Sequence, residues 1–181
     1  MANSRLISIS KVLSLILRHK PEQFGVVLDA EGYALIEDVL AAVRARIPDV
    51  TERDLAAVVE TIEPDKRRFT LTEHEIRANY GHSLNERIQH EVQMPPAILW
   101  HGTTENAAPI ILSGGIRPMQ RQYVHLTTDL DLAARIGARR GPACILKVDA
   151  LRAHAEGVSF YRANESFWLA DLVPARFVSS K

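Results

Sequence analysis

The chain of 181 residues is long enough for one medium domain or two small ones, and its 46% hydrophobic content is typical of globular proteins rather than of collagen, coiled coils or disordered chains. Lysine plus arginine and aspartate plus glutamate each number 22, so the formal net charge is zero and a polyanion could bind only at a local cluster of positive charge. The single cysteine, Cys144, excludes an intramolecular disulfide framework and favours a reducing, cytoplasmic setting.

Neither a metal site nor a membrane segment is expected from the sequence. It contains no CxxC pair and no HExxH motif, which are the usual spacings of zinc ligands. Lys11 interrupts the apolar N-terminal stretch, and no small-residue cleavage site follows it. We therefore expect no metal, no signal peptide and no membrane span.

The first half of the chain predicts three helices followed by a small β-ribbon. Steps of three and four residues between apolar positions predict a helix that ends before Pro21, a second that ends before Pro48, and a third that begins after an N-cap at Thr51. Two short strands follow, at residues 69–71 and 75–77. The apolar positions are Leu6, Ile9, Leu13 and Ile16, then Ile36, Val39, Leu40 and Val43, then Leu55, Val58, Val59 and Ile62. This order of elements is typical of a winged helix-turn-helix.

A domain boundary is predicted between Asn85 and Pro96, where the periodicity fades and two prolines adjoin. We therefore expect one lobe at residues 1–90 and another at residues 97–181. The second lobe is predicted to be a compact α+β domain with a curved or split sheet. Its predicted strands are residues 98–100, 124–126, 143–148 and 177–178, and its predicted helices are residues 105–113 and 129–139.

Two histidines of the second lobe could contact a ligand. His101-Gly102-Thr103 is expected to end a strand, with a glycine that lets a ligand approach the backbone and a hydroxyl that can bond a sugar or cap the next helix. His125 lies inside an apolar strand. The alternative for the first is an ordinary strand-to-helix turn, and for the second a half-buried sheet residue.

Three arginines are candidates for binding phosphate. Arg18, Arg68 and Arg121 stand at a helix end, a strand start and a loop, and a guanidinium offers a planar fork that matches phosphate oxygens. The alternative for each one alone is a solvated surface charge. The stretch from Gly137 to Gly141 lacks the complete pattern of a phosphate-binding loop. Residues 81–83, Gly-His-Ser, read as a simple turn.

Six motifs occur in an order that resembles the RNA 2′-phosphotransferases, an NAD-dependent family that removes the splice-junction 2′-phosphate from tRNA. The resemblance covers nearly the whole chain. The motifs are Leu13-Ser-Leu-Ile-Leu-Arg-His19 with Pro21, Asp65-Lys-Arg-Arg-Phe69, Ile76-Arg-Ala-Asn-Tyr-Gly-His-Ser83, Trp100-His-Gly-Thr103, Gly115-Ile-Arg-Pro-Met-Gln-Arg-Gln-Tyr-Val-His-Leu126, and Trp168-Leu169 with Val173-Pro174.

The resemblance implies an N-terminal winged-helix lobe that binds RNA and a C-terminal ADP-ribosyltransferase-like lobe that binds NAD. The implied catalytic set is Arg18, His19, Arg68 and Arg121, with Lys66 as a further RNA-phosphate ligand. The implied NAD-binding residues are His101, Gly102, Thr103, His125, Leu126, Thr127 and Phe167. The implied partners are NAD and an RNA that bears a 2′-phosphate, and we expect a monomer.

The resemblance also implies a reaction in two steps. A 2′-phosphate oxygen of RNA attacks the nicotinamide ribose of NAD and releases nicotinamide, which leaves an ADP-ribosylated RNA phosphate. The ribose 2″-hydroxyl then attacks phosphorus and releases 2′-hydroxyl RNA and ADP-ribose 1″,2″-cyclic phosphate. Two alternatives stay open: an ADP-ribosyltransferase that caps 5′-phosphate ends of RNA or DNA, and a winged-helix sensor without catalysis. The role of His19, as acid or as phosphate ligand, also stays open.

Overall fold

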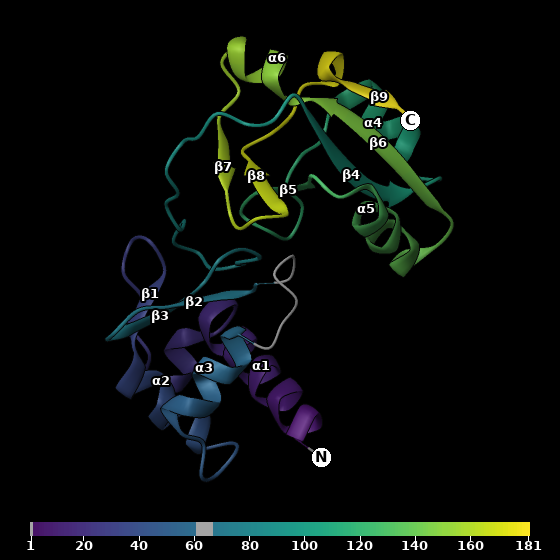
Figure 1. Ribbon diagram of the computed structural model, residues 1–181. Coiled ribbons are helices and arrows are strands. Elements are labelled where there is room, and N and C mark those ends of the chain that lie inside the picture. The colour runs from purple at the N-terminus through teal and green to yellow at the C-terminus, as the bar shows by residue number, and fades with distance from the viewer. Residues whose placement is uncertain (1, 61–66) are drawn as a thin grey trace. The chain divides into compact units, whose positions relative to one another are not determined.

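The chain forms two compact units, Met1–Gln89 and His90–Lys181, of which the computed structural model describes residues 2–60 and 67–181 (Figure 1). Each unit has an antiparallel sheet and a hydrophobic core of its own. The mixture of helices with two antiparallel sheets confirms the predicted α+β class. Ile62 and Lys66 lie outside the described residues.

The first unit combines helices with a three-stranded sheet in the order β1-β3-β2. The central strand pairs on both sides, since Ile76 lies opposite Ala34 on one edge and Leu71 on the other. The elements are α1 (Ala2–Arg18), η1 (Pro21–Phe24), β1 (Tyr33–Leu35), α2 (Ile36–Arg44), α3 (Glu52–Glu60), β2 (Phe69–Leu71) and β3 (Glu75–Ala78).

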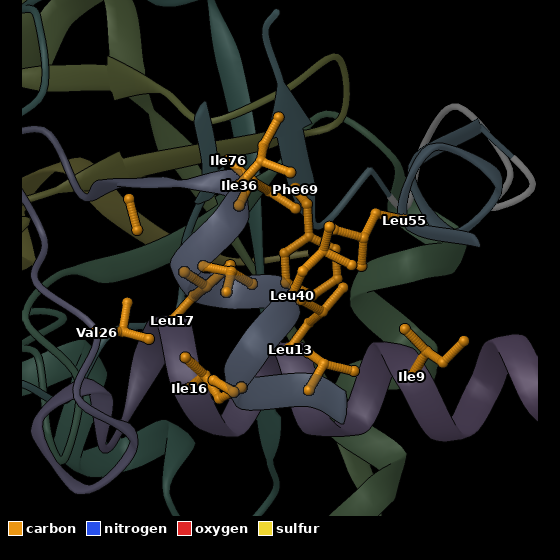
Figure 2. Packing of buried hydrophobic residues seen from close by; sticks show 14 of the residues in the cluster. Ile9, Leu13, Ile16, Leu17, Val26, Ile36, Leu40, Leu55, Phe69 and Ile76 are labelled. Carbon is orange, nitrogen blue, oxygen red and sulfur yellow. The ribbon is translucent and has the colours of Figure 1, made fainter. Parts of the chain in front are cut away.

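The core of the first unit follows from the helical spacing of its apolar residues. Leu13 of α1, Leu40 of α2, Leu55 of α3 and Phe69 of β2 are buried in one cluster (Figure 2). Phe69 is 1% exposed, so the strand that carries it is held against the helices at its first residue. This burial fixes the start of β2, next to Arg68, relative to the end of α1.

The second unit is built on a six-stranded sheet in the order β7-β8-β5-β4-β6-β9. In the described register, one residue pair, Trp100 with Thr127, joins β4 to β5, whereas seven pairs join β4 to β6. The elements are β4 (Ile98–Thr104), α4 (Ala108–Gly114), β5 (Val124–Thr127), α5 (Leu130–Gly137), η3 (Ala138–Arg140), β6 (Ala143–Asp149), α6 (Ala150–Ala155), β7 (Phe160–Arg162), β8 (Phe167–Ala170), η4 (Ala175–Phe177) and β9 (Val178–Ser180).

One sequence prediction about the second unit is wrong. His101-Gly102-Thr103 does not end a strand, because β4 continues to Thr104 and each residue of the motif is paired with β6. The glycine inside the strand is explained by α5, which lies so close to β4 that a side chain at this position would collide with its backbone. Strands β1, β7 and β8 and helix α6 were not predicted, since all are six residues or shorter.

None of the helices within residues 2–60 and 67–181 combines the length and the apolar character needed to cross a membrane.

Candidate active site

Arg18 ends helix α1, and two aromatic rings and a carbonyl hold its guanidinium in one orientation. The guanidinium carbon lies 5.5 Å from the ring centre of Phe69 and 5.0 Å from that of Tyr80. Its Nη2 donates to the carbonyl oxygen of Arg68 at 3.3 Å. Stacking on aromatic rings fixes a planar cation without neutralising its charge, unlike a carboxylate partner. A guanidinium held in this way could bind an anion.

His19 follows Arg18 in the sequence, and Ser83 contacts both residues. Its Nδ1 lies 2.8 Å from Oγ of Ser83, and the backbone N–H of Ser83 donates to the carbonyl of Arg18 at 2.9 Å. His19 and Ser83 line a cavity of about 460 Å³ in the first unit, formed otherwise by residues 20–23, 26–30 and 84–88. The half-buried imidazole is thus fixed at the edge of a space that a ligand can enter.

Arg68 immediately precedes β2, and Asn79 holds the backbone around it. The backbone N–H of Asn79 donates to the carbonyl of Arg68 at 2.9 Å, its Nδ2 donates to the carbonyl of Arg67 at 3.2 Å, and its Oδ1 accepts from the hydroxyl of Thr70 at 2.6 Å. The Arg68 side chain itself is exposed. The Arg18 guanidinium thus lies at the backbone of Arg68, from which the exposed Arg68 side chain extends, and an anion could bind to these cations.

In the second unit, the tautomer of His101 is set by its partner. Its Nδ1 lies 3.0 Å from the backbone carbonyl oxygen of His125, and because a carbonyl can only accept, Nδ1 carries the proton. Burial lowers the pKa of His101, and the bond to His125 offsets this in part. The ring is therefore neutral near pH 7, and its Nε2 presents a lone pair that can accept from a hydroxyl such as that of a ribose.

The other predicted NAD residues of the sheet divide between its two faces. His125, Thr127 and Phe167 share one face, because Thr127 pairs with Phe167 and successive side chains alternate. Leu126 points the other way and is a core residue at 1% exposure, so only its backbone could contact a ligand. Thr127 Oγ1 accepts from the N–H of Asp129 at 3.1 Å, which gives its hydroxyl a local role in the turn before α5.

Gly102 and Thr103 contact helix α5. An added Cβ at Gly102 would lie 1.9 Å from the carbonyl oxygen of Ala133, and one at Gly137 would lie 2.5 Å from the carbonyl oxygen of Thr103. The two glycines let strand and helix approach closely, as backbone packed on backbone. The structure thus explains Gly102 by packing, without a ligand.

Arg121 lies in the bend before β5, where its charge interacts with that of Arg140. Burial lowers the pKa of its guanidinium, and the neighbouring charge of Arg140 lowers it further. Two guanidinium groups that are close enough to repel each other favour the binding of an anion between or beside them. Arg140 belongs to η3, within the stretch from Gly137 to Gly141 whose sequence lacks the complete pattern of a phosphate-binding loop.

Comparison with known proteins shows the family to which this chain belongs. Residues 4–172 match the family described as RNA 2′-phosphotransferase, Tpt1 / KptA family. Relatives named probable RNA 2′-phosphotransferase are 42% identical over 181 residues in Rhizobium rhizogenes (99% of this chain, 96% of the relative), 39% identical over 173 residues in Acetivibrio thermocellus (94% of each), and 39% identical over 178 residues in Streptomyces coelicolor (98% and 97%). The chain belongs to this family.

The resemblance seen in the sequence is therefore confirmed, and the chain is an enzyme of the transferase class. For an RNA 2′-phosphotransferase, the structure adds residues that the sequence did not single out. Tyr80 stacks on Arg18, Asn79 holds the backbone of Arg68, and Ser83 contacts His19. All three lie in the Ile76–Ser83 motif, whose last three residues read as a simple turn in sequence. Among the described residues, no group of three His, Cys, Asp or Glu side chains could hold a metal ion.

Proposed function

We propose that this protein removes an internal 2′-phosphate from RNA in an NAD-dependent reaction, through an ADP-ribosylated RNA phosphate. The observations that support the proposal, in a member of the RNA 2′-phosphotransferase family, are the Arg18 guanidinium held at the Arg68 carbonyl and the adjacent His19 held at Ser83. A phosphate monoester dianion requires several positive groups at one place, and in a chain of zero net charge such a place must be built locally. We assign this role in the first unit to Arg18, His19 and Arg68.

In the first step, a nonbridging oxygen of the RNA 2′-phosphate forms a bond to the anomeric carbon of the nicotinamide ribose, and the bond to nicotinamide breaks with its electron pair. NAD supplies an anomeric carbon with a leaving group that is already cationic. The protein therefore has mainly to position the two reactants, which the rigid mounting of Arg18 favours for the phosphate. No proton transfer is required, because nicotinamide leaves as a neutral molecule.

In the second step, the ribose 2″-hydroxyl attacks phosphorus, and the RNA 2′-oxygen leaves and takes up a proton. Negative charge grows on the nonbridging oxygens, so fixed guanidinium groups stabilise this transition state more than the ground state. We assign this role to Arg18 and Arg68, and, on the family resemblance alone, to Arg121. To His19 we assign either the binding of a phosphate oxygen or the transfer of a proton to the departing oxygen.

The second unit is proposed as the ADP-ribosyltransferase-like part that holds NAD, and the first as the winged-helix part that holds RNA. The neutral His101, whose Nε2 can accept from a ribose hydroxyl, supports this assignment. The positive charges of Arg121 and Arg140 would suit a pyrophosphate. RNA and NAD are both present in the cytoplasm, where we place the reaction.

The test is a short RNA with one labelled internal 2′-phosphate, incubated with the protein and with or without NAD. We expect the label to move to ADP-ribose 1″,2″-cyclic phosphate and nicotinamide to appear in equal amount. A 5′-phosphorylated RNA without a 2′-phosphate is the comparison substrate. Accumulation of an ADP-ribosylated 5′ end would favour the capping reaction, and no nicotinamide release with either RNA would refute the proposal.

A further inference from the structure

Ser83 makes two contacts with the end of helix α1, although 64 residues separate it from His19. Its backbone N–H donates to the carbonyl of Arg18 at 2.9 Å, and its Oγ lies 2.8 Å from Nδ1 of His19. The first contact places the Ser83 backbone, and the second directs its hydroxyl at one nitrogen of the imidazole. The other nitrogen, Nε2, lies on the opposite side of the ring.

The segment that presents this hydroxyl is held by buried neighbours. Asn79 is 5% exposed and is hydrogen-bonded to the backbone of residues 67 and 68, and His82 is 2% exposed. Gly81, between them, has a φ of 89°, a left-handed conformation that favours glycine. Ser83 itself is exposed, so its hydroxyl is placed by the segment and not by packing of its own side chain.

We propose that Ser83 is a positioning residue for His19: its hydroxyl donates to Nδ1 and so keeps the proton of the neutral imidazole on Nε2. The inference rests on the proposed function, in which His19 faces the RNA phosphate. Phosphate oxygens only accept, so an Nε2–H binds them, whereas the opposite tautomer would present a lone pair to an anion. A hydroxyl can donate or accept, and only donation gives the tautomer that suits a phosphate.

The proposal implies a particular dependence on pH. Below the range in which imidazoles take up a second proton, both ring nitrogens carry a proton, and Nε2–H is present whatever Ser83 does. Above that range the tautomer matters, so the effect of Ser83 should grow with pH. The charged groups that line the same cavity are Lys20, Glu22, Asp29, Glu86 and Arg87. Because they are unchanged in a Ser83 variant, comparison of variant with wild type at each pH isolates the hydroxyl.

The direct test is NMR of the full chain with 15N-labelled histidine at about pH 8, above the range in which imidazoles ordinarily titrate. Correlations between the ring nitrogens and carbon-bound protons show which nitrogen carries the proton. We expect Nε2–H for His19 in the wild type, a mixture of tautomers in Ser83→Ala, and recovery of Nε2–H in Ser83→Thr. Ser8→Ala is the matched control, since Ser8 is an exposed serine on α1 that bonds only the carbonyl of Ser4 among its described contacts.

The second readout is the single-turnover rate of 2′-phosphate removal. Ser83→Ala should lower it on the order of tenfold at about pH 8 and less at about pH 5.5, with Ser83→Thr close to wild type. Because Ser83 is exposed, the urea midpoint of Ser83→Ala should match that of Ser8→Ala. A wild-type His19 with the proton on Nδ1, or a loss of rate equal at both pH values, would overturn the inference. Nε2–H by NMR without any 2′-phosphate removal would instead refute the proposed function.

Discussion

Replacing Gly102 with alanine tests why a glycine stands in the middle of strand β4. The added Cβ would lie 1.9 Å from the carbonyl oxygen and 2.8 Å from the carbonyl carbon of Ala133 in α5. To reach ordinary contact at 3.4 Å, strand and helix would have to separate by about 1.5 Å. No side-chain rotation relieves the clash, because both atoms are backbone. The close contact between Gly137 and Thr103 would be lost in the same movement.

A shift of this size is costly in a packed unit. Overpacking costs about 1–3 kcal/mol, and a backbone clash belongs at the upper end, so we expect the free energy of unfolding of the second unit to fall by about 3 kcal/mol. For a unit of this size that lowers Tm by roughly 12–24 °C. Urea denaturation followed by tryptophan emission reports on this unit, because both tryptophans of the chain, Trp100 and Trp168, belong to it.

Gly114→Ala is the matched control for Gly102→Ala. Gly114 is the last residue of α4, and no atom lies within 4 Å of the place where a Cβ would be added. Alanine there should leave stability unchanged or raise it by up to about 1 kcal/mol. The reasoning is refuted if Gly102→Ala unfolds at the wild-type urea concentration. Loss of nicotinamide release at unchanged stability would show that the glycine serves the approach of a ligand, as the sequence suggested.

Two further predictions concern the reaction, and a third concerns folding stability. Arg68→Ala and Arg121→Ala should each slow the second step on the order of a hundredfold more than nicotinamide release, so that ADP-ribosylated RNA accumulates in single-turnover assays. Lysine at either position should restore the rate only in part. If both alanine variants react at the full rate and no intermediate accumulates, the two arginines are ordinary surface charges. Activity should persist in EDTA, since the roles assigned to Arg18 and His19 need no metal, and a requirement for added magnesium or zinc in the chemical step would contradict them. Because burial lowers the pKa of His101, the unfolded chain takes up this proton at higher pH than the folded one. Stability of the second unit should therefore begin to fall as pH drops through about 6.5 and should fall further below it, less so in His101→Gln, as measured by urea titrations monitored by tryptophan emission.

Sequence periodicity predicted the first unit well because its helices bury one continuous apolar stripe each. Leu13 and Ile16 of α1 are fully buried, as their spacing required, and the strand at Phe69–Leu71 has the predicted bounds. Strand β1 escaped prediction because it consists of three residues that run directly into α2. Strand β8 was not predicted because all its side chains are buried, which leaves no alternation of apolar and polar residues.

The surroundings of the candidate site could not be predicted in the same way. Arg18 was singled out by family resemblance, but its stacking on Tyr80 and its bond to the Arg68 carbonyl join segments about fifty or more residues apart. No local pattern contains such contacts. The contact between Ser83 and His19 could not be predicted either. Gly-His-Ser is typical of a turn, and only the fold shows that this turn ends against His19.

The two histidines of the candidate sites show how a partner atom can select what an imidazole recognises. His101 bonds a backbone carbonyl, which cannot donate, so its proton stays on Nδ1 and its Nε2 accepts. His19 contacts a hydroxyl, which can donate, and under our proposal its proton stays on Nε2, which then donates. The two rings thus present opposite hydrogen-bonding character. An acceptor suits a ribose hydroxyl and a donor suits a phosphate oxygen, and these are the groups that the proposed reaction brings to the second and first units, respectively.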